Sequence, residues 1–299
     1  MTMTTSVSQF LSRPGGRQVE VHDLTPDAPA DAPVVLLCHV APGSGAFDPD
    51  PAVTAARGIR LIAVDRAGYG GSDAADDNEF ATVVLAADDA AAALETVLMP
   101  GTKAGVVGWS AGGRVALALA QRRPDLVGRV AVVATPAPDE EVPWIPEDNK
   151  AGIEALRGAA ASVAHAALTQ AFGPLLDTLT GEARFGLMGV GEADAGLLGE
   201  PGVADRLRVM LDEAFAKGAA GIAADIAGYT LRPWGFEPGE VGTEVLLGYG
   251  AADEIGPAHG EWWQRALPHA RLEVVPEVGH LVVVPLWDRV LSHVSSTDV

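Results

Sequence analysis

Short runs of branched apolar residues recur along this chain, and most are followed by an alanine-rich stretch with helical periodicity. Apolar runs this short, bounded by glycine or proline, are typical of strands buried on both faces. Their alternation with helices predicts an α/β fold in which a mostly parallel sheet is covered on both faces. The six runs are PVVLLCHV (33–40), RLIAVDRA (60–67), AGVVGWS (104–110), GRVAVVAT (128–135), TEVLLGYG (243–250) and RLEVVPE (271–277).

Two further strands are expected at the beginning of the chain. Residues 6–12 and 17–25 are strand-like and flank a Pro-Gly-Gly turn, which predicts a hairpin. The hairpin brings the expected sheet to eight strands. Helices are expected at 51–58, 80–98, 111–123 and 259–267.

The alternation of strands and helices is interrupted once, in residues 138–234. This stretch contains helical patterns at 150–172 and 203–229 but no convincing strand. It is far longer than an ordinary connection in an α/β domain. We therefore predict a core domain made of residues 1–137 and 235–299, with a helical cap subdomain of residues 138–234 inserted into it.

Acidic side chains outnumber basic ones by 40 to 20, which gives a formal net charge of −20. This charge argues against nucleic acids and anionic membranes as partners, because both would be repelled. Residues 1–16 lack the basic and apolar regions of a secretory signal, and no apolar run has the length of a membrane span. Cys38, the single cysteine, excludes an intramolecular disulfide and a multi-cysteine metal site, and its apolar neighbours predict a core position. We expect a cytoplasmic protein whose partner is a small-molecule substrate; the sequence leaves open whether it is a monomer or a homodimer.

The sequence Gly108-Trp109-Ser110-Ala111-Gly112 lies between an expected strand and an expected helix. The Gly-x-Ser-x-Gly pattern alone is common, but a tight strand-to-helix turn raises the serine hydroxyl above the sheet. The small neighbours allow the strained backbone of such a turn, and the helix N-terminus supplies free N–H groups. Ser110 is therefore the candidate nucleophile.

Two later loops supply the partners that such a serine needs. His280 follows the expected strand 271–277, where open α/β sheets build their sites, and a neutral imidazole can take a serine proton near neutral pH. Asp253 follows the expected strand 243–250 and could orient the imidazole. Asp139 and Glu254 are the competing carboxylates. We favour Asp253 because Asp139 lies in an acidic run and Glu254 would point to the opposite side of an extended segment.

Together, GWSAG, the order Ser…Asp…His and the helical insertion resemble the α/β-hydrolase superfamily over nearly the whole chain. The stretches CHVAPGS (38–44) and DRAGYGGSD (65–73) add to the resemblance. The resemblance implies an oxyanion hole formed by the backbone N–H groups of Ala41 and Ala111. The chain departs from the family pattern at Val40, where glycine is usual, so this backbone must stay in the β region or the loop must be rearranged. His39, Arg66 and Arg114 are expected to be structural.

The resemblance implies a cap-bearing serine hydrolase that cleaves a small, neutral or apolar carboxylic ester through an acyl-enzyme. No metal or organic cofactor is needed for this chemistry. Hydrolysis of an amide, a lactone or a carbon–carbon bond, and cofactor-free perhydrolysis, remain open on the same triad. A receptor with the hydrolase fold that binds a small ligand without turnover is the non-enzymatic alternative. The side chains expected to line the substrate pocket are Val40, Trp109, Phe185 and Met188.

Overall fold

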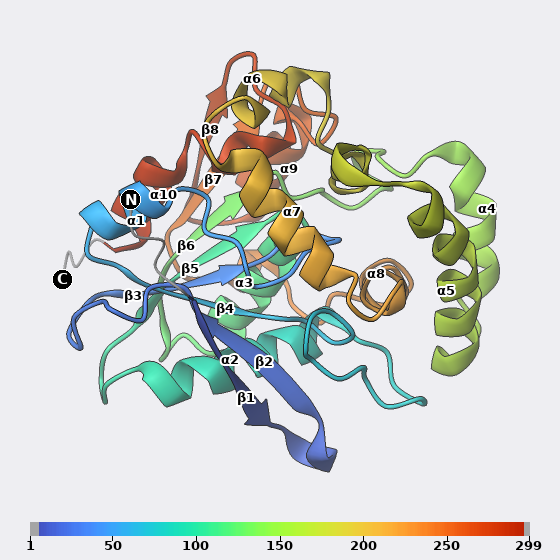
Figure 1. The fold of residues 1–299 in the computed structure, drawn as a ribbon, viewed down its shortest axis with the longest axis horizontal. Helices are drawn as coiled ribbons and strands as arrows, with labels where there is room; N and C mark the ends of the chain where they lie inside the picture. Colours follow the sequence, from blue (N-terminus) through green and yellow to red (C-terminus); the bar gives the residue numbers. More distant parts are fainter. Residues whose placement is uncertain (1–5, 296–299) are drawn as a thin grey trace.

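The computed structural model describes residues 6–295 and contains one eight-stranded sheet (Figure 1). The strand order is β1-β2-β4-β3-β5-β6-β7-β8, with β2 antiparallel to both of its neighbours and all other pairs parallel. The predicted fold class is confirmed. The strands are β1 (Val7–Ser12), β2 (Gln18–Asp23), β3 (Val34–Cys38), β4 (Arg60–Val64), β5 (Ala104–Trp109), β6 (Val127–Val133), β7 (Val245–Gly250) and β8 (Ala270–Val275).

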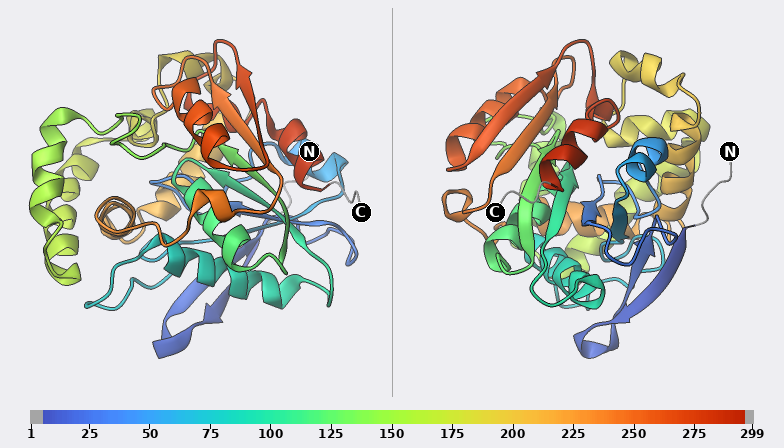
Figure 2. Two further views of the ribbon diagram at one scale, coloured as in Figure 1. Left: turned by 180° about the vertical axis from the view of Figure 1, so that it is seen from behind. Right: turned by 90° about the vertical axis from the view of Figure 1, so that its left-hand side faces the viewer.

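Helices cover both faces of this sheet (Figures 1 and 2). α2 (Val83–Val97), α3 (Ala111–Arg122) and α9 (Pro257–Ala266) share one apolar core, while α1 (Pro51–Ala56) and α10 (Trp287–Val294) border a second core on the other face. Neighbouring strand residues alternate between the two cores: Val132 of β6 lies in the first and Val133 in the second. Burial on both faces explains why the strands lack polar alternation.

Helix α10 was not predicted from the sequence. Its buried residues Trp287, Val290, Leu291 and Val294 follow the i, i+3, i+4, i+7 spacing of an amphipathic helix. The indole N–H of Trp287 donates a hydrogen bond to Thr54 Oγ1 of α1 at 2.8 Å, which ties the two helices together. The spacing was therefore a readable signal for this helix.

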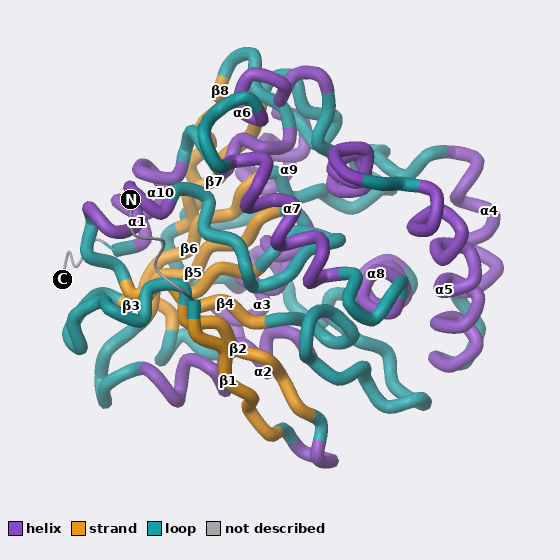
Figure 3. Tube along the Cα trace, viewed as in Figure 1, coloured by secondary structure: helices purple, strands orange, loops and turns teal. Residues whose placement is uncertain are grey.

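Between β6 and β7 the described chain forms helices and loops but no strand (Figure 3). The helical run expected at 150–172 is two helices, because the chain turns at 157–160, around Gly158. The elements are α4 (Glu147–Leu156), α5 (Ala161–Thr178), η2 (Gly181–Met188), η3 (Glu192–Asp194), α6 (Ala195–Leu198), α7 (Val203–Ala214), α8 (Ala220–Asp225), η4 (Ile226–Thr230) and η5 (Pro238–Glu240); η4 is a π-helix and the other η elements are 3₁₀ helices.

This helical insertion has two parts that pack differently. α4 and α5 project to one side of the molecule (Figures 1 and 2), where α5 packs on α8 through Leu168 and Ala223. In contrast, η2 and α7 pack on the sheet's own core: Phe185 and Met210 are buried in the same cluster as Val133 of β6. The second part therefore connects the insertion to the strand ends that carry the candidate site.

Candidate active site

The three residues predicted to act together all follow the carboxyl ends of parallel strands in the same half of the sheet. Ser110 follows β5, Asp253 lies just beyond β7, and His280 follows β8 and begins the 3₁₀ helix η6 (His280–Val283). Because parallel strands end at the same edge of a sheet, the fold collects these side chains there.

Ser110 occupies a strained turn between β5 and α3. Its backbone has φ 54° and ψ −120°, in the positive-φ region that non-glycine residues rarely adopt. The Ser110 N–H donates to the carbonyl of Val133 at 2.7 Å, and the Thr135 hydroxyl donates to the Ser110 carbonyl at 2.8 Å. A Cβ atom at Gly112 would lie 2.0 Å from the Cys38 carbonyl oxygen, so only glycine fits beside the turn. These contacts hold a conformation that costs energy, which is typical of a nucleophile elbow.

His280 and Asp253 form a buried pair. Nδ1 of His280 lies 2.8 Å from Oδ2 of Asp253, and both side chains are only 2% exposed. The other carboxylate oxygen of Asp253 accepts the N–H of Ile255 at 3.1 Å, which fixes the loop. Nε2 of His280 is buried and has no hydrogen-bond partner among the described residues. Since Asp253 occupies Nδ1, Nε2 is the nitrogen left to exchange a proton.

Trp109, the residue before the nucleophile, brings His280 next to the elbow. Its indole N–H donates to the His280 carbonyl at 3.1 Å, and the two ring centroids are 6.0 Å apart. No hydrogen bond joins Ser110 Oγ to His280 Nε2 in the described structure. Catalytic hydrogen bonds are often long in unliganded enzymes and shorten when substrate binds.

The two competing carboxylates lie elsewhere. Asp139 accepts the backbone N–H groups of Trp144 and Ile145, both at 2.7 Å, and pairs with Lys150 at 3.3 Å. Partial burial would raise the pKa of Asp139, but these donors and the ammonium group hold it below its usual value. Glu254 is exposed. Among the described residues, the carboxylate that contacts His280 is that of Asp253.

The loop that follows β3 carries the first expected oxyanion donor. Within residues 6–295, the Ala41 N–H has no hydrogen-bond acceptor; Ala111 is the first residue of α3, where an N–H has no intrahelical acceptor. Both residues are partly exposed. Val40 is not among the non-glycine residues with positive φ, so its backbone tolerates valine where the family usually has glycine.

A buried ionic network holds this loop. Arg66 donates to the carbonyls of His39 at 2.5 Å and Val40 at 3.0 Å, and pairs with Asp225 of α8 at 2.6 Å. The Tyr69 hydroxyl donates to the same carboxylate at 2.9 Å. Burial, together with the charge of Arg66, lowers the pKa of His39 well below its usual value, so this imidazole is neutral. Arg66 and His39 thus have the structural roles expected of them.

Cys38 has the core position expected for it. Burial raises the pKa of its thiol to about 12, so the thiol stays protonated.

The four residues expected to line a substrate pocket meet in one apolar cluster. Val40, Trp109, Phe185 and Met188 are at most 3% exposed and belong to the same core cluster. Trp109 is fully enclosed and also packs on Phe47, with ring centroids 5.5 Å apart. These side chains are therefore packed in the core on this face of the sheet and do not line an open surface.

One residue beside the site was not anticipated from the sequence. Asp194 of η3 is fully buried, and its carboxylate accepts the backbone N–H groups of Gly279, His280 and Leu281, each at 3.1 Å. Gly189, which follows η2, lies against the His280 ring, where an added Cβ would come within 3.2 Å of Cγ. The helical insertion thus holds the histidine loop directly. Nothing in the local sequence GEAD marks Asp194, because its partners lie more than 80 residues away.

A second group of titratable side chains lies outside the candidate triad. Glu20, His22, Asp65 and Glu213 place ligand-type atoms within 4.8 Å of one another. They are engaged by the protein itself: His22 Nε2 lies 3.1 Å from Asp65, Glu20 accepts the Gly71 N–H at 2.7 Å, and the Ser44 hydroxyl donates to Glu213 at 3.1 Å. We interpret this group as a connection between the core and α7.

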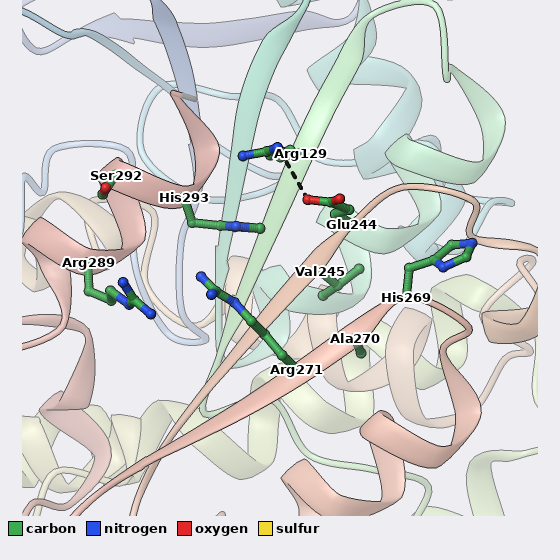
Figure 4. A pocket seen from close by; sticks show the side chains of 9 residues that line it. All are labelled: Arg129, Glu244, Val245, His269, Ala270, Arg271, Arg289, Ser292 and His293. Atoms are coloured by element: carbon green, nitrogen blue, oxygen red, sulfur yellow. Dashed lines mark ion pairs between the residues drawn. The ribbon is translucent and has the colours of Figure 1, made fainter. Parts of the chain in front are cut away.

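A cavity of about 530 Å³ lies at the opposite edge of the sheet, near the amino ends of β6, β7 and β8 (Figure 4). Several of its polar side chains are engaged by other groups of the protein: Arg129 contacts Glu244 at 3.2 Å, Arg289 contacts Glu273 at 2.9 Å, and His293 Nε2 lies 3.0 Å from the Val130 carbonyl. Because the triad follows the carboxyl ends of the strands, this cavity is separate from the candidate site.

Comparison with known proteins agrees with this fold. Residues 33–284 match the family described as alpha/beta hydrolase fold. The chain belongs to this family.

Individual relatives of the alpha/beta hydrolase fold family add detail. A pimeloyl-[acyl-carrier protein] methyl ester esterase of Chromobacterium violaceum is 30% identical over 184 residues, 58% of this chain and 62% of that protein. The match spans less than two thirds of that relative's length. The solved esterase of Exiguobacterium antarcticum has a TM-score of 0.65 and 19% identity, covering 97% of this chain and 100% of its own. A solved hydrolase of Pseudomonas aeruginosa PA01 has a TM-score of 0.64 and 21% identity, and the match covers 97% of this chain and 98% of that protein. At such identities the structural likeness concerns the fold alone, whereas the family match shows that this chain is an alpha/beta hydrolase.

No helix among residues 6–295 combines the length and the apolar character needed to cross a membrane.

Proposed function

We propose that this alpha/beta hydrolase cleaves small carboxylic esters through a covalent acyl-enzyme on Ser110. The observation that carries the proposal is the combination of the strained Ser110 turn with the 2.8 Å contact between His280 Nδ1 and Asp253. That contact leaves Nε2 of His280 as the proton acceptor beside the serine.

In the first half of the proposed reaction, Ser110 Oγ attacks the ester carbonyl while His280 Nε2 takes its proton. Asp253 fixes the imidazole tautomer and stabilises the imidazolium that forms. The carbonyl electrons move to oxygen, and the N–H groups of Ala41 and Ala111 stabilise that oxyanion. When the electrons return, the bond to the alcohol breaks and His280 protonates the leaving alcohol. The acyl group is then bound to Ser110.

The second half uses the same groups in reverse. Nε2 of His280 takes a proton from water, whose oxygen attacks the acyl carbonyl. The tetrahedral intermediate then collapses, the proton passes from His280 to Ser110 Oγ, and the carboxylic acid is released.

Ester chemistry is supported by relatives that carry esterase names, in particular the methyl ester esterase of Chromobacterium violaceum. The apolar character of Val40, Trp109, Phe185 and Met188 favours a small substrate with a neutral or apolar body, although these side chains are buried. The net charge of −20 disfavours nucleic acids and anionic membranes as partners. We assign the insertion of residues 138–234 the role of a cap, because η2 and Asp194 contact the histidine loop.

The proposal is tested with Ser110→Ala, a fluorophosphonate probe and a panel of aryl esters, amides and lactones. Wild type should hydrolyse esters and become labelled, and Ser110→Ala should lose both, with turnover falling by a factor on the order of 10⁶. Ser8→Ala, which changes an exposed serine of β1, is the matched control and should behave as wild type. Labelling that survives in Ser110→Ala would assign the nucleophile elsewhere. Faster turnover of amides or lactones would redirect the substrate class, and saturable binding without turnover would favour the receptor alternative.

A further inference from the structure

A cavity of about 800 Å³ lies between the core and the projecting helix α4. Its walls come from α3, from residues 138–145 after β6, from α4, and from residues 229–234. This volume is in the range of small-molecule sites. Its lining includes the side chains Arg114, Trp144, Ile153, Leu231, Arg232 and Trp234.

The unusual feature of this cavity is a buried arginine without a carboxylate partner. Arg114 of α3 is 4% exposed, and its guanidinium group donates to the Pro136 carbonyl at 3.1 Å. No ion pair of Arg114 occurs among the described residues. By contrast, Arg66, the other buried arginine among the described residues, pairs with the carboxylate of Asp225 at 2.6 Å. Burial lowers the pKa of Arg114 to about 10, so it remains charged at neutral pH.

The aromatic neighbours of Arg114 offset only part of the cost of this charge. Its guanidinium carbon lies 4.4 Å from the ring centroid of Trp234 and 5.8 Å from that of Trp144. Such contacts stabilise a buried guanidinium only in part. Removing an ion from water is costly, and buried charges are normally paired. The charge of Glu140 in the cavity wall raises the pKa of Arg114, but no carboxylate among the described residues forms an ion pair with this guanidinium.

Unused N–H donors around the same cavity indicate the chemistry of the missing partner. Arg114 Nε, Trp144 Nε1 and Arg232 Nε are all buried and have no acceptor among the described residues. A buried donor without an acceptor destabilises the folded protein. All three can only donate hydrogen bonds, so their complement is an acceptor, and the charge of Arg114 favours an anionic one.

We propose that this cavity binds a small carboxylate with a flat apolar body, whose charge pairs with Arg114. The indoles of Trp144 and Trp234, with Ile153 and Leu231, would contact the body of the ligand. Two other cations of the cavity wall already have carboxylate partners: Lys150 pairs with Asp139 at 3.3 Å, and Arg157 pairs with Glu154 at 2.7 Å. Arg232 donates to the Ala159 carbonyl at 3.2 Å and adds a second guanidinium group to the wall. Arg114 was expected from the sequence to be structural, and this proposal gives it a second role.

Titration calorimetry with benzoate and benzamide tests the proposal. Wild type should bind benzoate, and benzamide, which has the same shape without the charge, should bind at least about tenfold more weakly. Arg114→Gln should weaken benzoate binding by at least about tenfold. Arg157→Gln removes the same charge from the paired rim arginine and should change binding less than about twofold. No saturable benzoate binding, equal binding of benzamide, or equal losses in the two arginine variants would each overturn the proposal.

Two further variants keep the test decisive. Ser110→Ala should bind benzoate like wild type, because binding at Arg114 does not depend on whether Ser110 is a nucleophile; failure of the ester hydrolase assignment is thus measured separately. If circular dichroism shows that Arg114→Gln is unfolded, Trp144→Phe replaces it. That change keeps the ring and removes one unused donor, and it should weaken benzoate binding about threefold or more. Unchanged affinity in Trp144→Phe would then count against the site.

Discussion

The carboxylate of Asp194 accepts the backbone N–H of His280 at 3.1 Å, although 86 residues separate the two in sequence. It also accepts the N–H groups on either side, from Gly279 and Leu281. Three N–H groups at the start of η6 are thereby satisfied by one buried charge, which suits the positive end of a helical turn. Asp194 is a positioning residue, because it acts on the backbone of His280 and not on a substrate.

Asp194→Ala should lower kcat at least about tenfold with little change in KM, because the loop that carries His280 loses three charge-assisted hydrogen bonds worth about 1.5–3 kcal/mol each. Ester hydrolysis and urea unfolding, measured on the same sample, check both parts of this expectation. Glu192→Gln is the control: it changes an exposed acid of the same 3₁₀ helix and should leave kcat unchanged. A loss confined to stability, with normal kcat in the folded protein, would contradict the positioning role.

The acid of the triad is tested by three matched variants. Asp253→Asn should lower turnover by roughly 10⁴ while the fold persists, because an amide favours the wrong tautomer of His280. Asp139→Asn and Glu254→Gln should each cost less than about tenfold, since neither carboxylate contacts His280. Steady-state kinetics on one aryl ester compares all three. If Asp139→Asn were inactive and Asp253→Asn remained active, the acid of the triad would be Asp139, which follows β6, and not Asp253.

Sequence reasoning reached the parts of the molecule that depend on local signals. The strand runs, the GWSAG turn and the loops after the strands are each encoded within about ten residues, and together they predicted the sheet and pointed to Ser110, Asp253 and His280. Asp194 could not be found in this way. An aspartate in a Gly- and Ala-rich stretch is typical of an exposed turn, and only the folded insertion brings it to η6.

The same limit applies to Arg114. One helical turn beyond Ser110, it occupies a position that sequence alone assigns to helix packing. That Arg114 has no ion pair among the described residues becomes visible only when the neighbouring carboxylates, Glu140 included, have been placed. Charge balance in a core is a property of contacts between distant segments, so it cannot be obtained from a pattern along the chain.

His22 should make stability depend on pH. Burial would lower its pKa, but the hydrogen bond to Asp65 and the charges of Asp65, Glu213 and Glu20 outweigh it and raise the pKa above 6.5. A raised folded pKa gives stability that is fully present below pH 6.5 and is lost as the pH rises through the folded value. His22→Gln should therefore lose more free energy of unfolding at pH about 6 than at pH about 8.5. Urea unfolding at both pH values measures the difference.

His293 supplies a control, because its pKa is shifted in the direction opposite to that of His22. Burial is the main cause that lowers its pKa below 6.5, so its contribution is present above that value and is lost at lower pH. His293→Gln should accordingly lose more free energy of unfolding at the higher pH than at the lower one. If both variants showed the same pH trend, the contacts around His22 would not be setting its titration.

The ion pair of Arg66 and Asp225 should support both the fold and catalysis. Asp225→Asn leaves Arg66 buried without its carboxylate, and breaking a buried pair in this way costs about 3–5 kcal/mol. Because Arg66 also holds the carbonyls of His39 and Val40, the adjacent Ala41 N–H should lose its alignment, and kcat should fall more than KM changes. Asp288→Asn, which breaks the exposed pair with Arg57, should alter neither unfolding nor kcat measurably. Thermal unfolding with ester kinetics on the folded fraction separates the two effects. An Asp225→Asn protein that is less stable but fully active when folded would show that the network stabilises the insertion without setting the oxyanion loop.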